Sequence, residues 1–196
     1  MGYSKAQKAR THKRIVAIAS KRFREKGLAG FGIAELMKEA GLTVGGFYKH
    51  FDSRDELVTE AVSSAFGDWQ RRVDAAVSGG PSVSLSELID DYLSDAHRKN
   101  PGTGCTFSAL ASEIARSDKR TRALTSEQVR NDLQLIVGLL PGEDKRAARS
   151  RATLTFSALV GAMVLARAVS DEALSREILN TVGDLLKNPA SEHSRE

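Results

Sequence analysis

Residues 40–51 read AGLTVGGFYKHF, and this stretch decides the fold class. Upstream of it, apolar residues recur at i, i+3, i+4 and i+7 between Ile33 and Ala40, which is the spacing of one face of a short helix. Gly41 is a residue at which such a helix stops and the chain turns. Thr43 is a favourable N-cap for a following helix. The stretch therefore predicts two helices joined by a tight turn.

The second of these helices has two different sides. At about 100° per residue, Phe47 and Phe51 fall on one side, whereas Gly45, Gly46 and Lys49 fall on the other. Each glycine costs the helix roughly 1 kcal/mol relative to alanine. The benefit is clearance, because backbone N–H groups at the start of the helix can then reach a phosphate or a base edge. The pattern predicts a helix that DNA approaches closely.

Charge is distributed unevenly along the 196 residues. Residues 1–54 carry twelve Lys and Arg against four Asp and Glu, a net charge of +8, whereas residues 55–196 carry a net charge of −4. A basic head beside a helix-turn-helix pattern indicates nucleic-acid binding. We interpret the basic run from Lys5 to Arg14 as an arm that tracks phosphates or enters a minor groove.

The segment from about Lys8 to Leu57 resembles the DNA-binding domain of the TetR/AcrR-family transcriptional repressors. The resemblance rests on the Gly-x-Phe-Tyr-x-x-Phe core of residues 45–51, which is followed by Ser53-Arg54. Val44 is a departure, since Lys or Arg is common there in the family. The combination of these motifs is specific, although no single one of them is.

The resemblance implies a fold, a function and a set of contacts. We expect an all-α protein of about nine helices, in which residues 1–54 form a three-helix helix-turn-helix domain. Residues 55–196 would form a helical effector-binding and dimerisation domain. Such a protein is a ligand-responsive dimeric repressor that reads a palindromic double-stranded DNA operator. The residues expected at the DNA are Lys13, Thr43, Val44, Gly45, Gly46, Tyr48, Lys49, His50 and Arg54.

The remainder of the chain is predicted to be helical. A fourth helix follows a capping box at Ser53, and further helices are expected at residues 85–99, 105–117, 119–140, about 144–170 and 171–187. Residues 152–169 are almost entirely apolar or small, with Ala158, Ala162 and Ala166 as a smooth stripe. We reject a membrane span because Thr, Ser and Gly dilute the segment. The last two long helices are expected to form a homodimer, the alternative being the chain's own core.

The family resemblance also implies a cavity among the middle helices for a small-molecule effector of unknown identity. Most candidate lining residues are aromatic or apolar side chains that alternatively belong to the plain core. Glu113 and Arg167 would orient a polar ligand or pair with each other. The candidates are Phe66, Trp69, Tyr92, His97, Cys105, Phe107, Leu110, Glu113, Phe156, Met163 and Arg167.

Cys105 suggests an alternative function, a thiol-based sensor of oxidants or electrophiles. It follows Gly-Thr-Gly and opens a predicted helix, where the helix dipole favours a reactive thiolate. The competing interpretation is a small buried apolar residue. An enzyme is not expected, because the four histidines are scattered and paired carboxylates are not evident, although His97 and Cys105 leave a dyad open.

Cysteine usage and the N-terminus bound the compartment and the cofactors. A single cysteine and a basic N-terminus without an apolar stretch before Ile15 predict a cytoplasmic protein. Neither a Cys/His cluster with metal-site spacing nor a glycine-rich phosphate loop is evident. We therefore expect no metal, no cofactor and no membrane partner.

Overall fold

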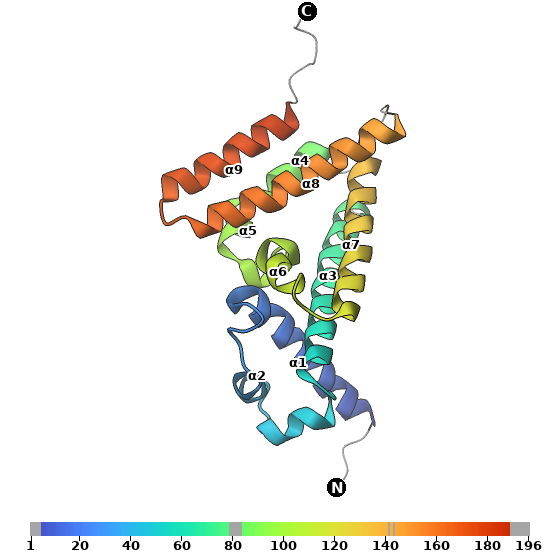
Figure 1. Ribbon diagram of the computed structural model, residues 1–196, viewed down its shortest axis with the longest axis vertical. Helices are drawn as coiled ribbons and strands as arrows, with labels where there is room; N and C mark the ends of the chain where they lie inside the picture. Colours follow the sequence, from blue (N-terminus) through green and yellow to red (C-terminus); the bar gives the residue numbers. More distant parts are fainter. Residues whose placement is uncertain (1–4, 79–83, 141, 143, 189–196) are drawn as a thin grey trace, which may run out of the picture. The chain divides into compact units, whose positions relative to one another are not determined.

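The computed structural model describes residues 5–78, 84–140, 142 and 144–188, and for residues 72–78 it describes the backbone alone. Within these residues every regular element is a helix, so the all-α prediction is confirmed (Figure 1). The elements of the described part are α1 Lys5–Lys26, α2 Ile33–Glu39, the 3₁₀-helix η1 Val44–Lys49, α3 Arg54–Ser78, α4 Leu85–Tyr92, α5 Asp95–Lys99, the 3₁₀-helix η2 Pro101–Thr103, α6 Thr106–Ile114, α7 Lys119–Gly138, α8 Lys145–Ala168 and α9 Glu172–Lys187.

The chain packs as two compact units, each assembled from two stretches of sequence. The first comprises Met1–Val73 and Pro101–Ser126, and the second comprises Asp74–Asn100 and Glu127–Glu196. The first unit therefore contains α1, α2, η1 and α6, and the second contains α4, α5, α8 and α9. The functional division after residue 54 that the sequence suggests stays a prediction.

The core of the first unit is built from the apolar faces of its N-terminal helices. α1, α2, η1 and the start of α3 all contribute side chains that are almost completely removed from solvent. Because each helix contributes, burial of these side chains fixes the orientation of η1 against α1 and α2. The largest of these side chains are Ile15, Phe23, Leu36, Met37, Phe47, Phe51, Leu57 and Val62.

The turn between α2 and η1 is a Schellman motif. Gly41 has a φ of +68°, a left-handed conformation that glycine adopts without strain. The Leu42 amide donates to the Met37 carbonyl at 2.8 Å, and the Gly41 amide donates to the Lys38 carbonyl at 3.0 Å. The turn predicted at Gly41 is thus confirmed, and it satisfies carbonyl groups at the end of α2.

The second helix of the pair is a 3₁₀-helix rather than an α-helix. Thr43 occupies its N-cap position with an extended backbone, but the Thr43 side chain makes no capping hydrogen bond. Two glycines disfavour the α-helix, and short segments of this length often adopt 3₁₀ geometry. Phe47 and Phe51 nevertheless share the buried side, as predicted, and their rings stack with centroids 5.2 Å apart.

In the second unit, α8 and α9 lie side by side and run in opposite directions (Figure 1). The hydroxyl of Ser175 in α9 donates to the Ala166 carbonyl of α8 at 2.6 Å. Ala162 and Ala166 are buried within this unit, so this part of the small-residue stripe packs inside the chain. A cluster from α7 and α8 completes the core of the unit and contains Leu133, Ile136, Leu140, Ala148 and Ala152.

The prediction of one helix over residues 85–99 is wrong, because the structure has two helices there. α4 ends at Tyr92 and α5 begins at Asp95. The Ser94 hydroxyl accepts a hydrogen bond from the His97 amide at 3.2 Å and so caps a new helix. A serine side chain that competes for backbone groups inside an apolar periodic stretch is the physical cause of the break.

Candidate nucleic-acid interface

The start of α1, the turn and η1 together form a concave surface on the first unit. The hollow has a volume of about 400 Å³ and brings two ammonium groups, two hydroxyl groups and an imidazole together with glycine backbone. Groups of these kinds are the ones that hold DNA phosphates. Four of the nine residues expected at the DNA line this surface. The complete lining is Lys8, Thr11, Gly41, Leu42, Thr43, Gly46, Lys49 and His50.

Most of the other residues expected at the DNA are in contact with solvent. Tyr48 is 70% exposed and Val44 is 51% exposed. Lys13 and Gly45 are exposed as well. The fully buried ring of Phe47 meets the Tyr48 ring edge-on at 5.2 Å. A core residue therefore supports the tyrosine while the tyrosine itself remains available to a partner.

The two glycines leave the outer backbone of η1 uncovered. A Cβ atom at Gly45 would meet no atom within 4 Å, so this position opens directly to solvent. A Cβ atom at Gly46 would lie 3.5 Å from Met37 Cε, which is an ordinary contact. Neither glycine has a positive φ. Since backbone geometry and packing do not require them, clearance for a close partner is the explanation that fits both positions.

His50 lies in the hollow beside several positive groups. Burial lowers the pKa of its imidazole, and the charges of His12, Lys8 and Lys49 lower it further. The rings of His50 and His12 have centroids 6.0 Å apart, and His12 Nε2 lies 2.6 Å from the Glu60 carboxylate of α3. Within the described residues, His50 Nδ1 is buried without a hydrogen-bond partner. An anion placed in the hollow would favour protonation of this imidazole.

Arg54, which was expected to hold phosphate at the start of α3, is already engaged inside the first unit. Its Nη2 donates to the Leu28 carbonyl, and its guanidinium lies over the Phe23 ring, 5.8 Å from the centroid. The predicted cap of the same helix is confirmed, because the Glu56 amide donates to Ser53 Oγ at 3.1 Å. A contact between Arg54 and DNA stays a prediction.

The interpretation of residues Lys5 to Arg14 as an arm is wrong. These residues form the first turns of α1, which continues to Lys26 because no glycine or proline interrupts it. The helix brings Lys8 and Thr11 to the hollow. Sequence reasoning missed Thr11, although its spacing of three residues from Lys8 places both on one helix face.

Several of the residues expected around an effector lie in the first unit. Phe66 and Phe107 are buried and stack with centroids 5.2 Å apart. Leu110 is buried as well, whereas Trp69 is half-buried. Cys105 is buried and occupies the N-cap position of α6. The structure thus brings the two phenylalanines together, and the sensor interpretation of Cys105 stays a prediction.

Glu113 joins α6 to the residues that follow α1. Its Oε1 accepts a hydrogen bond from the Leu28 amide at 2.9 Å. Gly27 has a φ of +80°, and a Cβ atom there would lie 3.1 Å from Glu113 Oε2, so the glycine makes room for the carboxylate. The carboxylate proposed from sequence as a ligand group is therefore bonded to the DNA-binding helices instead.

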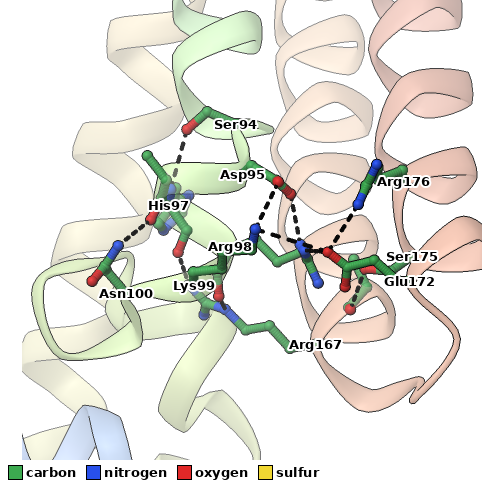
Figure 2. Close-up of polar contacts among 12 residues, drawn as sticks. Ser94, Asp95, His97, Arg98, Lys99, Asn100, Arg167, Glu172, Ser175 and Arg176 are labelled. Carbon is green, nitrogen blue, oxygen red and sulfur yellow. Dashed lines mark hydrogen bonds and ion pairs between the residues drawn. The ribbon is translucent and has the colours of Figure 1, made fainter.

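The remaining candidates lie in the second unit, where two of them connect helices. Figure 2 shows the Arg167 guanidinium of α8 donating to the carbonyls of His97 and the following residue at 2.6 and 3.1 Å, which caps the end of α5. The His97 Nδ1 lies 2.6 Å from the Tyr92 carbonyl, and the two rings meet edge-on at 4.7 Å. Met163 is fully buried and Phe156 is half-buried.

Sequence reasoning missed a buried acid in α7. Asp132 is only 6% exposed and accepts a hydrogen bond from Gln128 Nε2 at 2.9 Å. Burial raises the pKa of Asp132 to about 6, against the opposing effect of the Gln128 hydrogen bond. Gln128 and Asp132 are one turn apart on a helix side that continues with Ile136 and Leu140, both buried. Two polar residues in register with apolar ones were the available signal.

The first unit has the features of a helix-turn-helix DNA-binding protein: two short helices joined by a tight turn, a basic hollow and an outward-facing second helix. Residues 15–61 match the family described as bacterial regulatory proteins, tetR family. The chain belongs to this TetR family of DNA-binding transcriptional regulators.

Individual proteins agree with this assignment. Over 188 residues the chain is 25% identical to an uncharacterized HTH-type transcriptional regulator in the lacX 3′ region of Lactococcus lactis subsp. lactis, covering 90% of this chain and 91% of that protein. Over 93 residues it is 25% identical to the HTH-type transcriptional repressor DhaR of Mycobacterium sp. strain GP1, covering 47% and 46%. A TetR-family transcriptional regulator from Cytophaga hutchinsonii has the same fold, with a TM-score of 0.75 at 21% identity over 96% of this chain and 98% of the other.

Proposed function

We propose that this protein is a cytoplasmic dimeric repressor that reads a palindromic operator and is released by a small-molecule effector. The observation that carries the proposal is the outward surface of η1, where Tyr48 and Lys49 are exposed beside uncovered glycine backbone. Two such surfaces, one from each copy, enter successive major grooves about 34–36 Å apart. The relative DhaR is named a repressor, which supports repression over activation here.

The first experiment is selection of duplexes from a random pool by the purified protein. The enriched duplex is then titrated by fluorescence anisotropy at near-physiological salt, beside a scrambled duplex of the same composition. We expect an inverted repeat that binds two chains and is preferred by roughly 1,000-fold or more. A pool without enriched sequences, or an enriched duplex that binds no better than its scrambled form, contradicts the proposal.

Lys49→Ala is expected to weaken binding to the enriched duplex about tenfold. The side chain is exposed, lines the hollow, and is the charged side chain of η1. Loss of one phosphate contact per copy also makes the logarithm of affinity fall less steeply with the logarithm of salt, by about one per contact. Lys145→Ala removes the same charge from an exposed position in α8 and is the matched control. Equal affinities and equal salt slopes for both variants would exclude Lys49 from the interface.

The last two helices leave apolar surface in solvent, which supports the proposed homodimer. Leu154 and Leu165 are both exposed on α8, three turns apart and therefore on one face. Leu174 and Leu185 repeat this spacing on α9. By length and composition α8 would suffice to cross a membrane, yet only 33% of its apolar segment is buried inside the described structure. A second copy that packs on these four leucines removes the exposed surface from water.

Leu165→Glu is expected to convert the dimer to monomers, raising the dimer dissociation constant about 100-fold or more, because an unpaired carboxylate is costly to bury in an apolar interface. Sedimentation velocity measures the shift, and circular dichroism checks that the helices remain. Ser126→Glu adds the same charge to an exposed position of α7 and serves as the control. A Leu165→Glu protein that stays dimeric and binds DNA normally would place the interface elsewhere.

The effector response is proposed to run through α6. The stacked Phe66 and Phe107 lie on α3 and α6, and Glu113 of α6 holds the Leu28 amide after α1. A ligand that separates the two rings moves α6, and the Glu113 hydrogen bond transmits that movement to the helices of the DNA-binding surface. Trp69 is the chain's only tryptophan and lies in α3, so its fluorescence is a direct readout for a screen of candidate effectors.

A further inference from the structure

The recognition surface of η1 has few groups that can read a base pair by hydrogen bonding. Phe47 is buried and two of its neighbours are glycines, so the outward side chains of η1 are Val44, Tyr48 and Lys49. Bidentate reading of bases in the major groove uses Arg or Lys for guanine and Asn or Gln for adenine. η1 contains no Arg, Asn or Gln, and Lys49 also lines the phosphate-sized hollow. Hydrogen bonding alone therefore leaves much of a half-site unread.

Val44 is an apolar side chain at the leading end of this surface. It is 51% exposed and follows the exposed Thr43 at the N-cap. The next residue, Gly45, has open space where a Cβ atom would be. Among the described residues, the other large apolar side chains that lie in solvent are Tyr48 of the same helix and leucines and a valine on α8 and α9. The apolar surface of the first unit thus coincides with the face that DNA approaches.

We propose that Val44 reads the C5-methyl group of a thymine in each operator half-site. This methyl group is the apolar feature that the major groove displays, and an apolar side chain recognises it by contact. The uncovered Gly45 backbone allows the base edge to come close enough for that contact. The inference rests on the proposed DNA-binding function and adds the base that is read and the residue that reads it.

The test replaces each thymine of the enriched duplex, one position at a time, by deoxyuridine, which lacks only the methyl group. We expect one thymine in each half-site, related by the symmetry of the operator, whose replacement weakens binding of the parent protein about fourfold, the effect of one buried methyl group. Replacing that base pair by C·G weakens binding, and 5-methylcytosine at the same position recovers part of the loss, because it restores the methyl group in the same groove.

Val44→Ala is expected to bind the thymine and uracil duplexes almost equally. Tyr48→Phe is the matched control on the same helix: it is expected to bind both duplexes more weakly while it retains the fourfold preference for thymine. If no uracil replacement changes the affinity of the parent protein, or if Val44→Ala keeps the full preference, the inference is overturned although the protein still binds its duplex. A pool that yields no enriched duplex overturns the proposed function and this inference together.

Discussion

We expect Phe47→Ala to destabilise the first unit by about 3–5 kcal/mol and to abolish DNA binding. The ring is completely buried, stacks on Phe51 and supports Tyr48. Its removal leaves a cavity directly beneath η1. A 3₁₀-helix of six residues with two glycines has little intrinsic stability, so it has no means of holding its position above that cavity.

Urea unfolding followed by tryptophan fluorescence measures this loss, because the chain's only tryptophan, Trp69, lies in α3 of the same unit. Phe47→Leu is the control, since it keeps most of the apolar volume and is expected to cost about 1 kcal/mol while DNA binding persists. If Phe47→Ala unfolds at the parent's urea concentration and still fails to bind DNA, Phe47 contacts the DNA itself rather than supporting η1 from the core.

The helix-turn-helix could be predicted from sequence because its signals are local. The apolar periodicity before Ala40, the left-handed Gly41 and the shared side of Phe47 and Phe51 each depend on residues within about one turn of one another. Each of these features therefore appears in the order of the residues themselves, before any tertiary contact is known. The same holds for the Ser53 cap, whose partner Glu56 is three residues away.

The features that sequence reasoning missed depend on partners that are distant along the chain. Arg54 was expected to reach a phosphate, but its guanidinium meets the Leu28 carbonyl 26 residues away. Glu113 was expected to orient a ligand, but it holds the Leu28 amide 85 residues away. Neither partner leaves a periodic signal, since a backbone group of any residue type satisfies such a side chain equally well. Site residues with long polar side chains are consequently the ones that sequence places least well.

Asp132→Asn is expected to stabilise the protein by about 3 kcal/mol at pH 8. The pKa of Asp132 is about 6 in the folded chain, against an ordinary value of 3.8. The folded chain therefore binds more protons than the unfolded chain between these two values. The stability linked to this proton is complete below about pH 4 and is lost as the pH rises through about 6, above which the buried carboxylate is charged. Asparagine keeps the shape and the Gln128 hydrogen bond without the charge.

Urea unfolding at one protein concentration, near pH 4 and near pH 8, measures the effect without a contribution from dimer dissociation that differs between samples. The advantage of Asp132→Asn is expected to shrink to below about 1 kcal/mol near pH 4, because the parent carboxyl is then neutral in the fold. Glu127→Gln neutralises an exposed carboxylate of the same helix and is expected to change little at either pH. An Asp132→Asn protein that is less stable than the parent near pH 8 would show that a cation stabilises the carboxylate in the native state. An acid that costs stability in its own fold is typical of a residue that is retained for binding, so the stabilised variant is also the one in which a weakened effector response is expected.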